Sequence, residues 1–363
     1  MPEPSCARGP QARRKAGGPA PDPLGHSLVH ERFPALRHAL PRLSLGSGPT
    51  PVRRLEALSG ARAGPDVWVK NDGLYGTLWG GNKARKLEWS LADALRRGRR
   101  TVLTVGALAT NHGLATTLYA REHGLDTVLL LVDQPIDDHV RRQLRRIEES
   151  GAVVHRTHDK LRTLATLPWF LLRYSDRSAR RTPYFLTVGG SSPVGCLGYV
   201  EAALELGEQV RAGELPEPSH AVIALGSGGT AAGLLLGLRV AGLRTRVVAV
   251  LVNDGIRLNA RVIAHLARRS ERLMRRRGAS FPALSLGPGD LTVDTGSLGA
   301  GYGHRTREAE SARELLVERE ELRLEPVYTA KAMAALLRLR EEGAFGAGPV
   351  LYWHTHNALA PSD

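Results

Sequence analysis

The stretch that decides the fold is AVIALGSGGTAAG, residues 221–233. It opens with a short apolar run typical of a buried strand, passes through a glycine-rich turn and continues into an apolar segment of helical length. A strand, a tight turn and a helix in this order form the repeating unit of a parallel α/β sheet. The backbone N–H groups of such a turn can bind a phosphate, and the hydroxyls of Ser227 and Thr230 add donors.

Other interpretations of the same turn remain open. Gly226, Gly228 and Ala231 also fit the G-x-G-x-x-A pattern of a dinucleotide site, and Asp254 follows the next apolar run, where a ribose-binding acid could stand. A Walker phosphate loop is excluded, because no lysine follows the glycines. The turn could also join a strand to a helix without binding any ligand.

The chain on either side repeats the alternation of strand and helix. From Val67 onward, short β-branched runs alternate with amphipathic segments of helical length, which predicts an α/β fold with parallel sheets. Turn residues cluster at 188–193 and mark a boundary between two lobes. The expected strands are Val67 to Lys70, Thr101 to Val105, Thr127 to Val132, Val153 to His155, Tyr184 to Val188, Ala221 to Leu225, Val247 to Leu251 and Val350 to His354.

A second glycine-rich turn carries a candidate reactive amine. Gly80 and Gly81 precede Asn82 and Lys83, and a helical pattern begins at once. A cation is disfavoured at a helix N-terminus, so the helix dipole and the neighbouring Arg85 and Lys86 should lower the pKa of Lys83. A lowered pKa suits a lysine that attacks a carbonyl group. The alternative is a surface lysine in a charged first turn.

A third turn, at residues 110–113, follows the strand Thr101 to Val105. Thr110 is suited to cap the helix that begins there, which explains the threonine alone. Asn111 and His112 offer an amide and an imidazole to whatever the other two turns bind. Loops after parallel strands meet at one edge of a sheet, so these three turns predict a shared ligand site.

Composition excludes several classes of protein. The net charge of +14 comes from arginines spread among glutamates and apolar residues, and no recognition helix or zinc spacing accompanies it, so we expect no nucleic-acid partner. No apolar run is long enough to span a bilayer, so we expect no membrane association. Cys6 and Cys196 are too far apart for a disulfide framework, which favours a cytoplasmic protein. Residues 1–27 are rich in Pro, Gly and Arg and are expected to be a disordered tail.

The three turns occur together with further motifs, in an order that resembles one enzyme family. From about Pro51 onward the chain is similar to the D-cysteine desulfhydrase and 1-aminocyclopropane-1-carboxylate deaminase family of pyridoxal-phosphate enzymes, with the tryptophan-synthase-β-like fold. The matching segments are residues 80–83, Asn111, 188–191, 198–201, 226–230, 301–303, 326–329 and 354–355.

The resemblance implies two lobes with the cofactor between them. Residues 28–85 and 189–363 would form a large domain that binds pyridoxal phosphate, and 86–188 a small inserted α/β domain. Lys83 would hold the cofactor covalently and move the Cα proton of the substrate. The other cofactor-binding residues would be Asn111, Gly226, Ser227, Gly228, Gly229, Thr230 and Thr329.

The same resemblance implies which residues face the substrate, a small amino acid. Tyr302 and Tyr328 would carry protons, or alternatively be buried aromatics. Thr110 would join them in catalysis. The substrate-binding residues would be Thr110, His112, Thr355 and His356.

The residue expected at the pyridine nitrogen favours one branch of the family. Threonine at position 329 cannot stabilise a pyridinium as a carboxylate would, whereas deaminases of the family usually place glutamate there. We therefore expect β-elimination of a D-cysteine desulfhydrase type, releasing ammonia and a 2-oxo acid, with sulfide if the substrate is cysteine. Ring opening of the cyclopropane amino acid, or cofactor binding with another substrate or without turnover, are the alternatives.

Some positions depart from the family pattern. Thr110 replaces a serine, Ala330 replaces a glycine, and His356 and Asn357 replace two glycines near the substrate. The last change should alter the pocket, so His356 and Asn357 are expected to face a polar substrate group. His354 and His356 alternate on a strand as metal ligands could, but we expect no metal site, because a third ligand is missing. Similar enzymes are commonly homodimers, and we expect one here.

Overall fold

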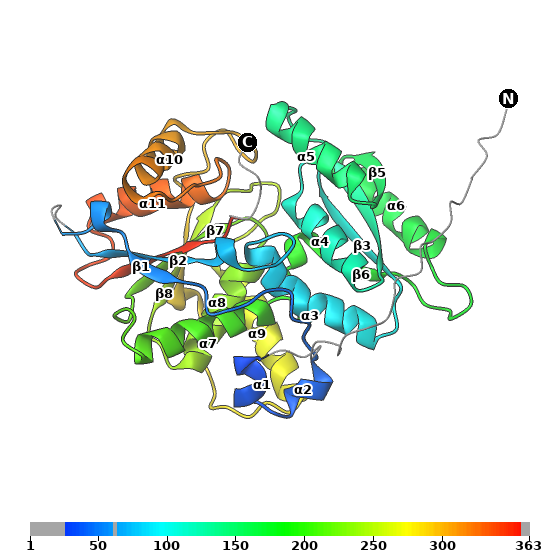
Figure 1. Ribbon diagram of the computed structural model, residues 1–363, viewed down its shortest axis with the longest axis horizontal. Helices are drawn as coiled ribbons and strands as arrows, with labels where there is room; N and C mark the ends of the chain where they lie inside the picture. Colours follow the sequence, from blue (N-terminus) through cyan, green and yellow to red (C-terminus); the bar gives the residue numbers. More distant parts are fainter. Residues whose placement is uncertain (1–25, 61–63, 357–363) are drawn as a thin grey trace, which may run out of the picture.

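The computed structural model describes residues 26–60 and 64–356, which form two lobes side by side (Figure 1). Each lobe is built on its own sheet, and helices cover both faces of each sheet. The α/β fold with parallel sheets is confirmed.

The large lobe contains a sheet of six strands in the order β1-β2-β10-β7-β8-β9. All neighbours run parallel except β1, which pairs antiparallel with β2 at the edge. The strands are β1 Val52–Arg54, β2 Val67–Asn71, β7 His220–Leu225, β8 Arg246–Leu251, β9 Leu291–Asp294 and β10 Val350–His354.

Alternate residues of the central strands serve two separate cores. Ile223 and Trp353 point into a core with α1, α2, α7, α8 and α9, while Val222 and Tyr352 point into a core with α10 and α11. A strand buried on both faces needs a continuous apolar run, which explains the composition of β7. The helices are α1 Leu28–Arg32, α2 Leu36–Ala39, α7 Leu197–Arg211, α8 Gly229–Ala241, α9 Ala260–Arg276, α10 Arg307–Glu320 and α11 Thr329–Glu341.

The small lobe contains a fully parallel sheet in the order β5-β4-β3-β6. Helices α4 and α5 cover one face and α6 the other. The elements are β3 Thr101–Ala107, α4 Asn111–Glu122, β4 Asp126–Val132, α5 Asp138–Glu149, β5 Val153–His158, α6 Lys160–Arg173 and β6 Tyr184–Leu186. Short 3₁₀ turns lie at Glu56–Leu58, Asp72–Leu74, Val188–Gly190 and Pro288–Asp290.

Helix α3, Asn82–Arg96, lies between the lobes and belongs to both. Trp89 packs in the core of the large lobe, while Leu87 and Leu91 pack in the core of the small one. Every residue from Ala84 to Ala94 is buried. A helix buried all round must pair its charges, since an unpaired buried charge is costly. Within α3, Glu88 accepts hydrogen bonds from Arg42 and from the hydroxyl of Tyr75.

Arg85 of α3 belongs to a larger buried charge cluster beneath the sheet. Its guanidinium donates to both carboxylate oxygens of Asp72, at 2.8 and 3.0 Å, and to Glu205 of α7 at 3.1 Å. Lys70 of β2 donates to the same Glu205 at 2.6 Å, and Tyr199 and Trp353 donate to Asp72. The cluster fixes α3 against α7 and the large sheet, and so fixes where Lys83 stands.

Some sequence-based expectations need correction. Edge strands β1 and β9 were not expected, and the strand expected at Tyr184 to Val188 ends at Leu186, because a 3₁₀ turn begins at Val188. Of the expected disordered tail, residues 1–25 lie outside the described part, but the side chain of Ser27 caps α1 and is buried. Within the described residues, no helix has the length and apolar character needed to cross a bilayer.

Candidate active site

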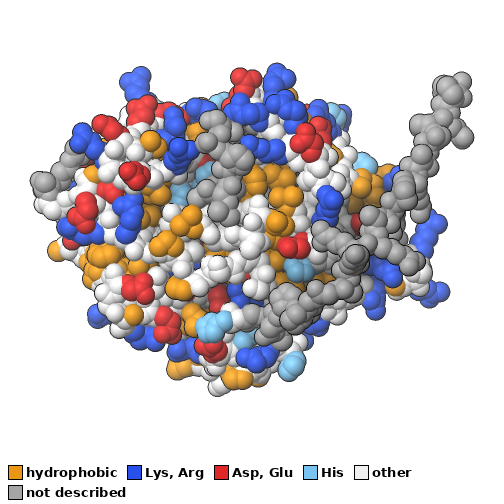
Figure 2. Space-filling model, in the orientation of Figure 1, with side chains coloured by type: hydrophobic (Ala, Val, Ile, Leu, Met, Phe, Trp, Pro, Cys, Tyr) orange, Lys and Arg blue, Asp and Glu red, His pale blue; other side chains and the backbone are white. Residues whose placement is uncertain are grey.

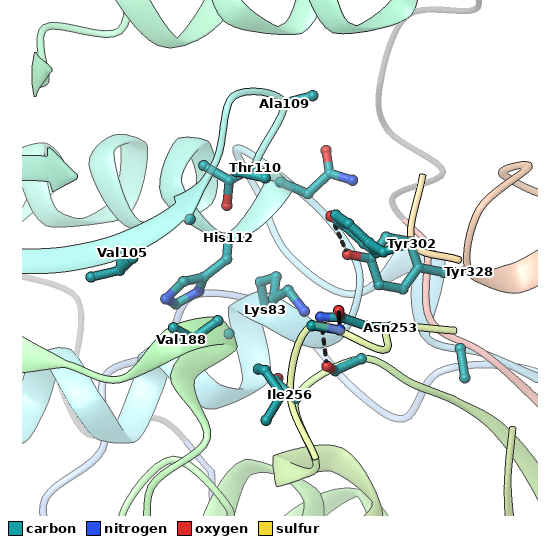
Figure 3. Close-up of a pocket in the computed structure, with 18 of the residues that line it drawn as sticks. Lys83, Val105, Ala109, Thr110, His112, Val188, Asn253, Ile256, Tyr302 and Tyr328 are labelled. Atoms are coloured by element: carbon teal, nitrogen blue, oxygen red, sulfur yellow. Dashed lines mark hydrogen bonds between the residues drawn. The ribbon is translucent and has the colours of Figure 1, made fainter. Parts of the chain in front are cut away.

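A cavity of about 590 Å³ lies between the lobes, at the carboxyl ends of strands β3 and β7 (Figure 3). Its size is typical of a small-molecule site. All three turns singled out in the sequence line it, as do Tyr302, Tyr328, Thr329, Thr355 and His356. The fold thus brings together residues that are up to 277 positions apart in the sequence, Trp79 and His356.

Lys83 projects into this cavity from the first turn of α3. Burial lowers the pKa of its amine to about 8. The expected lowering is thus present, but its cause differs from the one the sequence indicated. Arg85 points away into its carboxylate cluster, and withdrawal of the Lys83 amine from water accounts for the shift.

Two more basic groups lie buried beside Lys83. Lys86, one turn along α3, donates to the carbonyl oxygen of Gly189 at 3.2 Å, and burial together with Lys83 holds its pKa well below the usual range. The ring of His112 lies on the same side, and its pKa is likewise well below the usual value through burial and both lysines. A cavity so lined disfavours cations and favours an anionic ligand.

The turn from Gly226 to Thr230 forms the wall below Lys83 and leads into α8. Gly228 has φ +89°, a conformation that glycine adopts without strain. The side chain of Ser191, from the turn after β6, fixes this loop: its hydroxyl donates to Ser227 Oγ at 2.8 Å and accepts from the N–H of Gly229 at 2.9 Å. The amide of Asn82 donates to Thr230 Oγ1 at 3.2 Å, which joins the loop to the lysine-bearing turn.

Thr110 caps α4, as the sequence indicated. Its hydroxyl accepts from the N–H of Gly113 at 3.1 Å. Asn111 Oδ1 accepts from Gln143 of α5, and the ring of His112 shares a hydrogen bond of 3.2 Å with Thr104. The N-terminus of α4 faces the cavity, and a helix N-terminus attracts anions.

Tyr302 and Tyr328 lie on the opposite wall, as Figure 3 shows. The hydroxyl of Tyr328 donates to that of Tyr302 over 2.8 Å. Burial raises the pKa of both phenols, and that of Tyr328 lies well above its usual value. Both hydroxyls therefore keep their protons at neutral pH, so that either can donate one.

Thr329 lies in the cavity wall, buried, at the start of α11. Its hydroxyl accepts from the N–H of Glu325 at 2.7 Å and donates to the carbonyl oxygen of Glu325 at 3.1 Å. This residue is thus also a structural cap for the turn before α11. The carboxylate of Glu325 in turn accepts from the backbone N–H groups of Val327 and Tyr328.

The end of β10 closes the remaining side. Thr355 and His356 both line the cavity, and the carbonyl oxygen of Thr355 accepts from the N–H of Asn82. Asn357 lies outside the described residues. The rings of His354 and His356 are 6.5 Å apart, and no group of three potential metal ligands occurs in the described part of the chain.

Sequence reasoning missed several residues of this site. Ser191 was noted as a turn residue and within the matching segment 188–191, but without a role, and Asn253 and Glu325, which line the cavity, were not considered. Asn253 donates to the carbonyl oxygen of Gly226, and Glu325 accepts from the N–H groups of Val327 and Tyr328. Such contacts to backbone groups have no spacing rule in the sequence.

Comparison with known proteins agrees with this geometry. The family model described as pyridoxal-phosphate dependent enzyme matches residues 43–356. The chain is 34% identical to a D-cysteine desulfhydrase of Serratia proteamaculans, over 88% of this chain and 94% of that protein. It is 33% identical to a putative 1-aminocyclopropane-1-carboxylate deaminase of Pyrococcus abyssi, over 90% and 94%. A solved structure, an ACC deaminase homologue, superposes with a TM-score of 0.76 at 30% identity, covering 92% of this chain and 95% of that one.

The chain therefore belongs to the family of pyridoxal-phosphate-dependent enzymes. More particularly, it is a lyase or deaminase of the tryptophan-synthase-β-like fold, and its cofactor is pyridoxal phosphate. The residues present fit that cofactor. The buried Lys83 amine, with its lowered pKa, lies in the same cavity as the glycine loop at the N-terminus of α8. The amine suits the aldehyde of pyridoxal phosphate, and the loop suits its phosphate. The dinucleotide interpretation is thereby excluded.

Proposed function

We propose that this enzyme catalyses β-elimination from a small amino acid with a good leaving group, D-cysteine being the reference substrate. The observation that supports it most directly is the position of the Lys83 amine, across one cavity from a pair of protonated tyrosines. An elimination needs a base at Cα and an acid near the leaving group. The Lys83 amine on one side of the cavity would be the base, and a phenol on the other side would be the acid.

Lys83 is the proposed anchor and base. Pyridoxal phosphate supplies an electron-accepting ring that makes the Cα proton acidic. The Lys83 amine is the base that would remove that proton. With a pKa of about 8, about a tenth of the amine is neutral at pH 7, whereas an ordinary lysine would stay almost fully protonated.

The glycine loop and the head of α4 would hold the two anionic groups. Gly226, Ser227, Gly228, Gly229 and Thr230 are the proposed phosphate site. Asn111 is the proposed partner of the cofactor's 3-hydroxyl, and Thr329 is that of the pyridine nitrogen. A substrate carboxylate would lie at the N-terminus of α4, beside Thr110 and His112, with Thr355 and His356 on its other side.

Tyr302 and Tyr328 are the proposed proton carriers. When the Cβ–S bond breaks, its electron pair stays on sulfur, and a phenol proton neutralises the sulfide that leaves. Because the hydroxyls are hydrogen-bonded to each other, the proton lost by one can be restored by the other. The remaining products are ammonia and a 2-oxo acid, as for the desulfhydrase type.

Ring opening of 1-aminocyclopropane-1-carboxylate is the second candidate, supported by the name of the Pyrococcus abyssi relative and of the solved neighbour. Thr329 speaks against it. The threonine hydroxyl donates to the backbone carbonyl oxygen of Glu325. Because threonine carries no negative charge, this position would offer no carboxylate to a cationic pyridine nitrogen. A ring without that support is a weaker electron sink.

An assay with a substrate panel separates these functions. Wild type and Lys83→Ala would be loaded with pyridoxal phosphate and given D-cysteine, L-cysteine or 1-aminocyclopropane-1-carboxylate, with sulfide and 2-oxo acid measured separately. We expect sulfide and 2-oxo acid from D-cysteine only, and no turnover by Lys83→Ala. Lys160→Ala, which removes another lysine of the cavity wall, is the control. A 2-oxo acid from the cyclopropane substrate alone would favour the deaminase, and cofactor absorbance without product would refute turnover of these substrates.

We also propose that the enzyme is a cytoplasmic homodimer. Helix α6 supports a second copy, because Leu161, Leu164, Trp169 and Leu172 expose between 54% and 80% of their surface to water. Large apolar side chains gathered on one helix mark an interaction surface. Sedimentation of wild type against Leu164→Glu would test this, and a monomeric wild type would refute it. The Cys196 thiol is buried, and burial raises its pKa to about 11, so this cysteine is not exposed for disulfide formation.

A further inference from the structure

Lys331 is a buried lysine for which the proposed chemistry has no use. It lies in the first turn of α11, where the helix dipole disfavours a cation, and its side chain is excluded from water. Within the described residues no carboxylate pairs with it closer than 4 Å. Its ammonium donates instead to two backbone carbonyl oxygens, those of Leu298 at 2.7 Å and Gly301 at 3.3 Å. Retaining a buried cation at such a position requires a compensating interaction.

The two carbonyl groups belong to the loop that carries Tyr302. Gly299, Gly301 and Gly303 in this loop have φ of +66°, +123° and +84°. Glycine adopts these conformations without strain, but it also leaves the backbone flexible. Something else must hold the tyrosine in place. The N–H of Tyr302 donates to Asp254 Oδ1 at 3.1 Å, which fixes one point of the loop.

Lys331 supplies the other fixed points of the loop through its two hydrogen bonds to backbone carbonyl groups. Burial lowers the pKa of Lys331, and the charges of Glu325 and Asp254 raise it in part. These are the two acids that hold the tyrosines, since Asp254 accepts from the N–H of Tyr302 and Glu325 from the N–H of Tyr328. Lys331 and Asp254 therefore hold the loop of Tyr302 at separate points.

We infer that Lys331 is a positioning residue, whose ammonium clamps the 298–301 backbone so that the hydroxyl of Tyr302 meets that of Tyr328. Its effect on turnover rests on the proposed function of the tyrosines, but its effect on the loop does not. Lys331 touches neither the cofactor site nor the substrate side of the cavity, and it acts through Tyr302 alone. A displacement of about 1 Å at a reacting group can cost roughly a hundredfold in rate.

The test compares Lys331→Ala and Lys331→Met, in wild type and in a Tyr302→Phe background, all as the loaded enzyme. Methionine keeps most of the length and apolar volume, so it serves if the alanine variant fails to fold. Hydrogen–deuterium exchange of residues 298–303 measures the flexibility of the loop and does not depend on turnover. The kcat and KM for D-cysteine measure the effect of that flexibility on catalysis. Arg268→Met is the matched control, because Arg268 also donates to a backbone carbonyl, that of Leu286, but lines neither this loop nor the cavity.

We expect faster exchange confined to 298–303 and a kcat lower by roughly ten- to a hundredfold with KM changed less. The same substitution in Tyr302→Phe should lower kcat no further, since the hydroxyl it positions is already gone. Unchanged loop exchange would overturn the inference, and so would losses that multiply in the double variant. Faster loop exchange in a protein whose wild type turns over none of the amino acids would sustain the clamp and refute the proposed function.

Discussion

The hydroxyl oxygens of Tyr302 and Tyr328 lie 2.8 Å apart, although the residues come from separate segments, the glycine loop before α10 and the residue before α11. Burial raises the pKa of both, so the pair holds two protons across the working pH range. In the function proposed above, one phenol would donate to the substrate while the other restores its proton.

Removing either hydroxyl should therefore slow turnover without weakening cofactor binding. We expect Tyr302→Phe and Tyr328→Phe each to lower kcat by roughly ten- to a hundredfold, and the double variant to be little worse than either single one, because groups that act as a unit are not additive. Tyr184→Phe, which removes a hydroxyl bonded to Asp93 in the small lobe, is the control. Independent, multiplying losses would show that the tyrosines do not act as a pair.

Attachment of the cofactor should depend on pH through Lys83. Only the neutral amine attacks an aldehyde, and with a pKa of about 8 the neutral fraction rises from about a tenth at pH 7 to about half at pH 8. We expect the rate of reconstitution of the cofactor-free protein, followed by absorbance, to rise with pH and level off above pH 9. A rate that keeps rising tenfold per unit to pH 10 would mean that the amine has the pKa of an ordinary lysine.

Ser191 should matter for cofactor affinity although it is not in the glycine loop. Ser191→Ala removes the hydrogen bonds to Ser227 and to the N–H of Gly229, and so loosens the phosphate site before binding. With about 1 kcal/mol for each hydrogen bond, we expect the Kd for pyridoxal phosphate to rise by roughly five- to thirtyfold. Ser192→Ala is the neighbouring control, since Ser192 bonds only to Gly195 N within its own turn. Equal Kd values for both variants would contradict the prediction.

The charge cluster beneath α3 predicts a large loss of stability from one substitution. Arg85→Met leaves the carboxylates of Asp72 and Glu205 buried together with less positive charge, which should lower the free energy of unfolding by about 3–5 kcal/mol. Urea unfolding of the loaded enzyme measures this. Arg96→Met, which breaks a more exposed pair with Asp93, should cost less than about 1 kcal/mol. Similar losses for both would show that burial does not set the cost.

Much of the fold could be predicted because buried parallel strands leave continuous apolar runs. Thr101 to Val105 and Ala221 to Leu225 were placed correctly for this reason, and each lies within a strand of the structure. The edge strand Val52–Arg54 carries two arginines and no apolar run, and β9 is only Leu291–Asp294, so neither gave a signal. Edge strands are less buried than central ones, so their sequences need no continuous apolar run.

The candidate site could be predicted where a turn exposes its own backbone to the ligand. The turns at Lys83 and at Gly226 to Thr230 have a spacing that their chemistry requires. The residues that support the glycine loop follow no spacing, because Ser191 and Asn253 reach its backbone from segments that are distant in sequence. The cause of the Lys83 pKa was wrong for a related reason: the sequence shows which charges are adjacent but not that Arg85 turns away.

The position of helix α3 also links the stability of the folded protein to its cofactor. Its buried side chains belong to both cores, and a cofactor joined to Lys83 and seated on the loop before α8 would bind the folded arrangement and not the unfolded chain. Such a ligand stabilises in proportion to the logarithm of its concentration over its Kd. A chain without cofactor would therefore open at this junction more often than the loaded enzyme, and proteases would cut it more readily. Lys and Arg are interspersed with Asp and Glu over the face shown in Figure 2, so the charges on that face do not gather into a single patch.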